Sequence, residues 1–139
     1  MIKNHKVDII ICIHNMELPV DLRRAGIITG FFIILMIIGS SFEGNSIPNS
    51  YIFTLDKFLH VAEYFIFGTL LFFVFSSSSK KPDVISLILG TFYSIIDELY
   101  QSTVIGRNSS GLDVLADIIG LILSVFFIKL FLSSFVYDR

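Results

Sequence analysis

Residues 97–117 read DELYQSTVIGRNSSGLDVLAD, and this polar stretch stands between two segments apolar enough to be buried in lipid. An ionisable group at the centre of a bilayer costs roughly 2.5 to 3.5 kcal/mol on insertion scales. Such residues are therefore expected to face a bundle interior or a polar cavity, where they are functional candidates. We expect function to reside in the polar members of this cluster: Asp97, Glu98, Gln101, Arg107, Asp113 and Asp117.

The composition is that of an integral membrane protein. Of the 139 residues, 54% are hydrophobic and only 16% are charged, whereas soluble domains carry roughly 25% charged residues. This length makes one domain with room for about four spans of about 20 residues each. The net charge of −2 and the lack of a basic patch argue against a nucleic-acid partner. The single cysteine, Cys12, excludes an intramolecular disulfide and a cysteine-based metal site.

The apolar segments predict an all-α fold, an integral membrane bundle of about four transmembrane helices. In the third segment only residues 84–96 are uncharged, which gives about 20 Å of helix at about 1.5 Å per residue. This helix must extend through Gln101 to approach a hydrocarbon core of about 30 Å, so its acidic end lies near one membrane face. The four expected spans are residues 25–42, about 55–75, 84–101 and about 112–136.

The first 24 residues are predicted to be a cytoplasmic or interfacial tail, followed by the four-helix domain at residues 25–139. Two alternatives stay open at this end. Translation from Met16 would remove part of the tail, and Gly39-Ser40-Ser41 supplies the small residues of a signal-peptide cleavage site. The long charged lead and the spans that follow favour a retained anchor.

Basic residues fall on alternate connections between the spans, and Lys and Arg in short loops mark the cytoplasmic side. Both termini are therefore predicted to be cytoplasmic, and the acidic cluster is predicted to lie outside. The basic residues that carry this prediction are Lys3, Lys6, Arg23, Arg24, Lys80, Lys81 and Arg139.

Side chains spaced four apart share one face of an α-helix. The second span carries such a stripe of acid, imidazole and phenol, and the next two spans each carry a polar pair at the same spacing. Polar faces near one membrane surface are hidden only by turning toward one another, which predicts an outward-opening polar pocket between the last three helices. In it we expect Asp97 or Glu98 within hydrogen-bond or one-water reach of His60 or Arg107. The spaced residues are Asp56, His60 and Tyr64, then Asp97 with Gln101, then Asp113 with Asp117.

These motifs, over roughly residues 25–135, resemble the VanZ-like membrane protein family. The family is named for an accessory protein of glycopeptide (teicoplanin) resistance, and the resemblance implies a small multi-pass protein of the bacterial cytoplasmic membrane. Ile105 stands where a proline often precedes the Gly-Arg pair, and Asp117 stands where many members have asparagine. The run that carries the resemblance is Asp56-Lys57-x-x-His60-x-x-Glu63-Tyr64-x-x-x-Gly68, then Asp97-Glu98-x-x-Gln101, Gly106-Arg107, Asp113, Asp117 and Gly120.

Each candidate residue also has a purely structural interpretation. Aspartate suits helix N-caps, histidine can fix helix packing by bonding a carboxylate, and tyrosine anchors at membrane interfaces. Glycine allows helices to approach closely. An arginine in a loop can be solvated, although beside several carboxylates it more often pairs with them or binds an anion. The capping interpretation applies to Asp56 and Asp113, the packing interpretation of histidine to His60, and the interface interpretation to Tyr64. The close-approach interpretation applies to Gly68 and Gly120, and the solvated-loop interpretation to Arg107.

The favoured function is binding of an envelope lipid head group, a cell-wall precursor or a glycopeptide-like molecule, with a contribution to antibiotic or envelope-stress tolerance. Arg107 would grip phosphate or carboxylate with two parallel hydrogen bonds, and Gln101, Tyr64 and His60 would orient the ligand. The acidic residues Asp56, Asp113 and Asp117 complete the predicted ligand-binding set.

The alternative is a membrane-embedded hydrolase or transferase acting on a lipid-linked envelope intermediate. There Asp97 or Glu98 would be the general base, His60 would shuttle a proton and Arg107 would stabilise phosphate charge. A third hypothesis, an ion or proton path through Glu63, requires oligomerisation, and the sequence does not fix the oligomeric state. The missing activated nucleophile favours binding. The carboxylates could hold a hard divalent cation, and His60 could join a transition-metal site, but no dedicated metal motif is present and no cofactor is predicted.

Overall fold

A computed structural model of the chain describes residues 21–42, 49–76, 78–107 and 110–137, and the side chains of these residues except 49–54 and 135–137. Residues 1–20 of the tail predicted at residues 1–24, with Cys12, lie outside the described residues. The described part is all-helical and contains no strand, which confirms the all-α prediction. Its helices are α2 (Leu22–Ser40), α3 (Asn49–Ser76), α4 (Pro82–Gln101) and α5 (Gly111–Tyr137).

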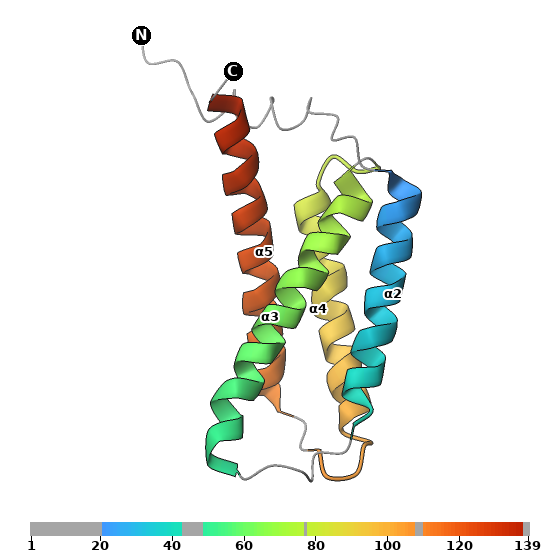
Figure 1. Cartoon of the computed structure of the whole chain (residues 1–139), viewed down its shortest axis with the longest axis vertical. Helices are drawn as coiled ribbons and strands as arrows, with labels where there is room; N and C mark the ends of the chain where they lie inside the picture. Colours follow the sequence, from blue (N-terminus) through green and yellow to red (C-terminus); the bar gives the residue numbers. More distant parts are fainter. Residues whose placement is uncertain (1–20, 43–48, 77, 108–109, 138–139) are drawn as a thin grey trace.

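Neighbouring helices along the chain run in opposite directions, so the bundle is an up-and-down arrangement (Figure 1). The beginnings of α2 and α4 therefore lie at the same end as the last turns of α3 and α5. Arg23, Arg24, Lys80 and Lys81 belong to this end, which we call the basic end, and the start of α5 with the last turn of α4 belongs to the opposite, acidic end. The orientation of these ends across a membrane stays a prediction.

Three stretches of the described chain are long and apolar enough to cross a membrane: Leu22–Ser40, Leu55–Ser76 and Gly111–Ser134. Together they support a membrane protein. Helix α4 is not among them, because it carries Asp83 near its start and Asp97 and Glu98 near its end. A fourth span therefore remains a prediction, although the outer face of α4 is as apolar as that of its neighbours, with Phe92 62% exposed.

Two helices begin at least three residues earlier than predicted. Helix α2 starts at Leu22 rather than Ala25, because the Asp21 carboxylate caps it by accepting a hydrogen bond from the backbone N–H of Arg23 at 3.0 Å. Helix α3 starts at Asn49 rather than near Leu55. Asp56 therefore lies inside α3, and the interpretation of Asp56 as a helix N-cap is wrong.

The hydrophobic core lies around α3, which packs against each of the other three helices. Tyr64 is fully buried in this core, and its ring meets that of Phe67 edge to face with centroids 5.9 Å apart. The interpretation of Tyr64 as a membrane-interface anchor is therefore wrong. The core cluster consists of Met36, Tyr64, Phe67, Leu71 and Leu121.

Helices α3 and α5 approach closely because glycine stands at their contact. A side-chain carbon at Gly120 would lie against the backbone oxygen of Val61 and 3.0 Å from the backbone nitrogen of Phe65. A side-chain carbon at Gly68 would lie 3.0 Å from Leu121. The close-packing interpretation of both glycines is confirmed, and the tight contact brings the polar faces of α3 and α5 within hydrogen-bonding distance.

Candidate functional site

His60 is held by a hydrogen-bonded chain that connects three helices. Its Nδ1 lies 2.9 Å from Oδ1 of Asp117 on α5, and the hydroxyl of Ser94 on α4 donates to Oδ2 of the same carboxylate at 2.6 Å. Asp117 is only 1% exposed, and these two contacts satisfy both of its buried oxygens. A carboxylate that accepts the Nδ1 proton fixes the ring orientation and leaves Nε2 as the lone-pair nitrogen.

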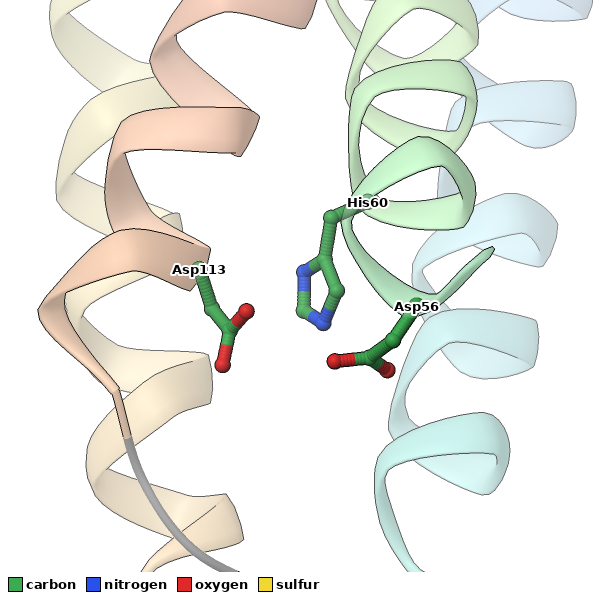
Figure 2. A group of neighbouring side chains, drawn as sticks. All are labelled: Asp56, His60 and Asp113. Carbon is green, nitrogen blue, oxygen red and sulfur yellow. The ribbon is translucent and has the colours of Figure 1, made fainter. Parts of the chain in front are cut away.

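A second cluster lies at the acidic end, beside the first. The ammonium of Lys57 donates to Oδ2 of Asp56 at 3.2 Å and to Oδ1 of Asp113. Asp56, His60 and Asp113 each offer one ligand atom, and these atoms lie within 4.8 Å of one another. Figure 2 shows the imidazole between the two carboxylates, with two of these residues from α3 and one from α5.

Asp113 occupies the first turn of α5, but its carboxylate accepts a hydrogen bond from the Lys57 ammonium. The hydroxyl of Ser110 instead accepts the backbone N–H of Leu112 at 3.2 Å, as an N-cap residue does. The Asp113 carboxylate thus joins α5 to α3, and the capping role predicted for it belongs to Ser110.

Asp97 and Gln101 turn away from this cluster. The Asp97 carboxylate accepts hydrogen bonds from the hydroxyl of Ser40 on α2 at 2.6 Å and from the amide of Gln101 at 3.0 Å. The expectation that this pair faces α3 and α5 is therefore wrong. Adjacent helical residues point about 100° apart, so Asp97 faces α2 while Glu98 faces the start of α5.

Glu98 and Arg107 leave polar atoms without partners among the described residues. Glu98 is 8% exposed; one of its oxygens accepts the backbone N–H of Ser110, while the other, Oε2, has no hydrogen-bond partner in the described part of the chain. The half-buried side chain of Arg107 forms no ion pair or hydrogen bond with the residues that the structure describes. The expected direct bond from Asp97 or Glu98 to His60 or Arg107 is not formed between these described side chains.

Glu63 links the separate clusters electrostatically. It is half-buried on α3 and interacts through space with His60, Asp97, Asp117 and Arg107. Through Glu63, the pair of His60 and Asp117 is connected electrostatically with Asp97 and Arg107. Asp113 and Glu98 make separate contacts, with Lys57 and with the backbone of Ser110. The predicted residues that are buried are His60, Asp97, Glu98, Gln101, Asp113 and Asp117.

Sequence reasoning missed the small and basic residues that complete the region. Ser94 could have been found, because the buried face of α4 carries Ser86, Gly90 and Ser94 at a spacing of four. Lys57 stands in the run that carries the family resemblance, but the sequence assigns it no partner, whereas the structure pairs it with Asp56 and Asp113. No signal marked Ser40 as the donor to Asp97, because a serine at the end of an apolar helix is equally suited to a loop or a cleavage site.

The arrangement supports three kinds of chemistry. A carboxylate-oriented imidazole can accept a proton, a half-buried guanidinium can bind phosphate or carboxylate, and a group of one imidazole and two carboxylates can hold a divalent ion. Each of these involves the acidic end, where α3, α4 and α5 meet.

Comparison with known proteins places the chain in a family. The family model described as VanZ/LLP1 matches residues 16–132, which include all four described helices up to Leu132. Neither the search of curated proteins nor the search of solved structures gave a match. Because the match extends over most of the sequence, this all-helical membrane protein belongs to the VanZ/LLP1 family.

Proposed function

We propose that this protein is a multi-pass protein of the bacterial cytoplasmic membrane whose acidic end faces outward and binds an anionic cell-envelope ligand. A lipid head group, a cell-wall precursor or a glycopeptide-related molecule has the required phosphate or carboxylate. Binding would contribute to tolerance of antibiotics or envelope stress. Both termini are cytoplasmic in this proposal, because the basic end carries the lysines and arginines of the short connections.

The observation that carries the proposal is the state of Arg107. A guanidinium that only balanced buried carboxylates would be paired with them, yet Arg107 forms no ion pair with the described residues, although the Glu63 charge is nearby. A half-buried arginine retains two parallel donors that match a phosphate or carboxylate. This is the state expected of a ligand-binding residue.

The test compares Arg107→Lys with Arg107→Ala in cells challenged with a glycopeptide and with an envelope stress, with protein level measured in parallel. Lysine keeps the charge but loses the planar two-donor geometry, so we expect Arg107→Lys to be nearly as damaging as Arg107→Ala. Arg24→Ala is the matched control, because Arg24 is exposed at the basic end, where it pairs with Asp21 at 3.1 Å. Full tolerance with Arg107→Ala at a normal protein level would end the proposal.

One observation favours a second candidate, a membrane-embedded enzyme acting on a lipid-linked envelope intermediate. The Asp117 carboxylate orients His60 as it would a general base, which can accept a proton at Nε2 from water or a substrate hydroxyl. This candidate predicts that the purified protein turns over such a lipid. In His60→Gln the turnover should be lost while binding of the intact lipid stays normal. Binding without turnover would favour the first.

A further inference from the structure

We propose that Asp56, His60 and Asp113 form a binding site for a divalent transition-metal ion of the Zn²⁺ type, which displaces the Lys57 ammonium from the two carboxylates. This site is separate from the Arg107 proposal, because metal content can be measured with no envelope ligand present. Its ligands come from α3 and α5, so the ion would join the two helices at the acidic end.

The donor set has the composition and the spacing for such an ion. Zinc is bound by imidazole nitrogen and carboxylate oxygen at about 2.0 to 2.2 Å, so a tetrahedral ion holds its ligand atoms about 3.4 Å apart. The three ligand atoms lie within 4.8 Å of one another, so modest side-chain rotations bring them to this spacing. A site with three protein ligands leaves one position for water or a substrate group, as catalytic zinc sites do.

An independent feature points to a ligand in this place. His60 is 92% buried, since only 8% of it is exposed, and its sole hydrogen bond among the described residues is made by Nδ1. The ring lies between the carboxylates of Asp56 and Asp113 (Figure 2). The Nε2 atom of this imidazole makes no hydrogen bond with the described residues, so the ring is placed to donate the Nε2 lone pair to a cation between the two carboxylates.

The surroundings of His60 match those of metal-ligating histidines, whose other ring nitrogen is almost always hydrogen-bonded to a carboxylate, a carbonyl or water. Asp117 supplies that carboxylate at 2.9 Å, and Ser94 holds Asp117 in turn at 2.6 Å. This arrangement fixes the tautomer that leaves Nε2 available and raises the basicity of the ring.

Lys57 shows that the two carboxylates already attract a cation. Its ammonium contacts both of them from a partly buried position. The flexible four-carbon stem of lysine allows the ammonium to withdraw when an ion enters. Lysine and metal therefore compete for the same carboxylates, and removal of the lysine charge is expected to strengthen metal binding.

The experiment measures Zn²⁺ binding to the full chain, purified with an affinity tag that contains no histidine, by metal analysis after equilibrium dialysis. Wild-type protein should bind one Zn²⁺ that depends on His60. We expect His60→Gln and Asp113→Asn to weaken this binding at least tenfold, and Asp117→Asn to weaken it about 10- to 100-fold through loss of ring orientation. Histidines outside the described residues are unchanged in every variant, so adventitious binding there cancels.

Lys57→Met gives a second measurement that does not require the ligand variants to fold. A metal site predicts tighter Zn²⁺ binding, by about tenfold or more, and a Zn²⁺-dependent rise in thermal stability. Lys129→Met is the matched control, because it also removes a lysine from an aspartate, Asp83, which belongs to no such ligand group among the described residues. Zn²⁺ affinity that is equal in wild type and His60→Gln, or Zn²⁺ stabilisation that is equal in Lys57→Met and Lys129→Met, would overturn the proposal.

Discussion

Replacement of Gly120 by alanine tests how the close contact of α3 and α5 builds the polar site. The added carbon would meet the backbone of α3 at Val61 and Phe65, and backbone atoms cannot rotate away as the end of a side chain can. The two helices must therefore separate. Because Gly120 follows Asp117 by one turn and Val61 follows His60 directly, the separation acts on the hydrogen bond between His60 and Asp117.

The expected loss of stability follows from three contributions. Overpacking of a tight contact costs about 1 to 3 kcal/mol. Weakening a hydrogen bond to a charged group costs about 1.5 to 3 kcal/mol, whereas alanine in place of glycine regains roughly 0.5 to 1 kcal/mol within a helix. Gly120→Ala should therefore lower the free energy of unfolding by about 1.5 to 5.5 kcal/mol.

Unfolding in mixed detergent micelles, with helicity as the signal, measures this difference. Gly30→Ala is the matched control, because a side-chain carbon at Gly30 meets nothing within 4 Å on its helix α2. The control should be unchanged or slightly more stable. If Gly120→Ala unfolds at the same detergent composition as wild type, or if both variants change equally, then the close contact is not what positions His60 and Asp117.

Three further predictions concern other parts of the bundle. Ser40→Ala removes a donor from a buried carboxylate on α4 and should lower the unfolding free energy by about 1 to 3 kcal/mol in the same assay; an equal loss in the exposed control Ser102→Ala would refute this explanation. Lys129→Met should change stability by less than about 1 kcal/mol, because the lysine side chain is 51% exposed, and a larger loss would show that this ion pair is shielded from solvent. Reporter fusions after Lys81 and after Arg139 should report a cytoplasmic location, and a fusion after Ser109 should report an external one. A cytoplasmic signal from the Ser109 fusion would place the acidic end inside.

The sequence predicts the helices well because their apolar stretches are long and end in polar turns. Helix ends are less certain where a cap is needed, as with Asp21, or where the first turns contain no clear start signal, as in α3. Hydropathy does not identify α4 as a fourth span, because Asp97 and Glu98 lower the mean hydropathy of this helix. These two acidic residues lie in its last turns, at the end where the candidate site is found.

Spacing arguments identify which residues share a helical face, but they do not determine which helix that face meets. The stripe of Asp56 and His60 on α3 meets α5, as expected if the polar faces of the last three helices turn toward one another. Asp97 and Gln101 have the same spacing, yet they meet Ser40 of α2, whose hydroxyl donates to the Asp97 carboxylate beside the Gln101 amide. Partners of this kind are fixed by the packing of the bundle, which a single sequence does not contain.

The central claim is that Arg107 binds an anionic envelope ligand at the acidic end. Native mass spectrometry of the full chain, extracted into nanodiscs from its own membrane, measures this most directly by the mass and charge of co-purifying molecules. The account predicts an anionic lipid or cell-wall precursor bound to wild type and to Arg24→Ala, and lost from both Arg107→Ala and Arg107→Lys. The same ligand retained at equal occupancy in Arg107→Ala would contradict it.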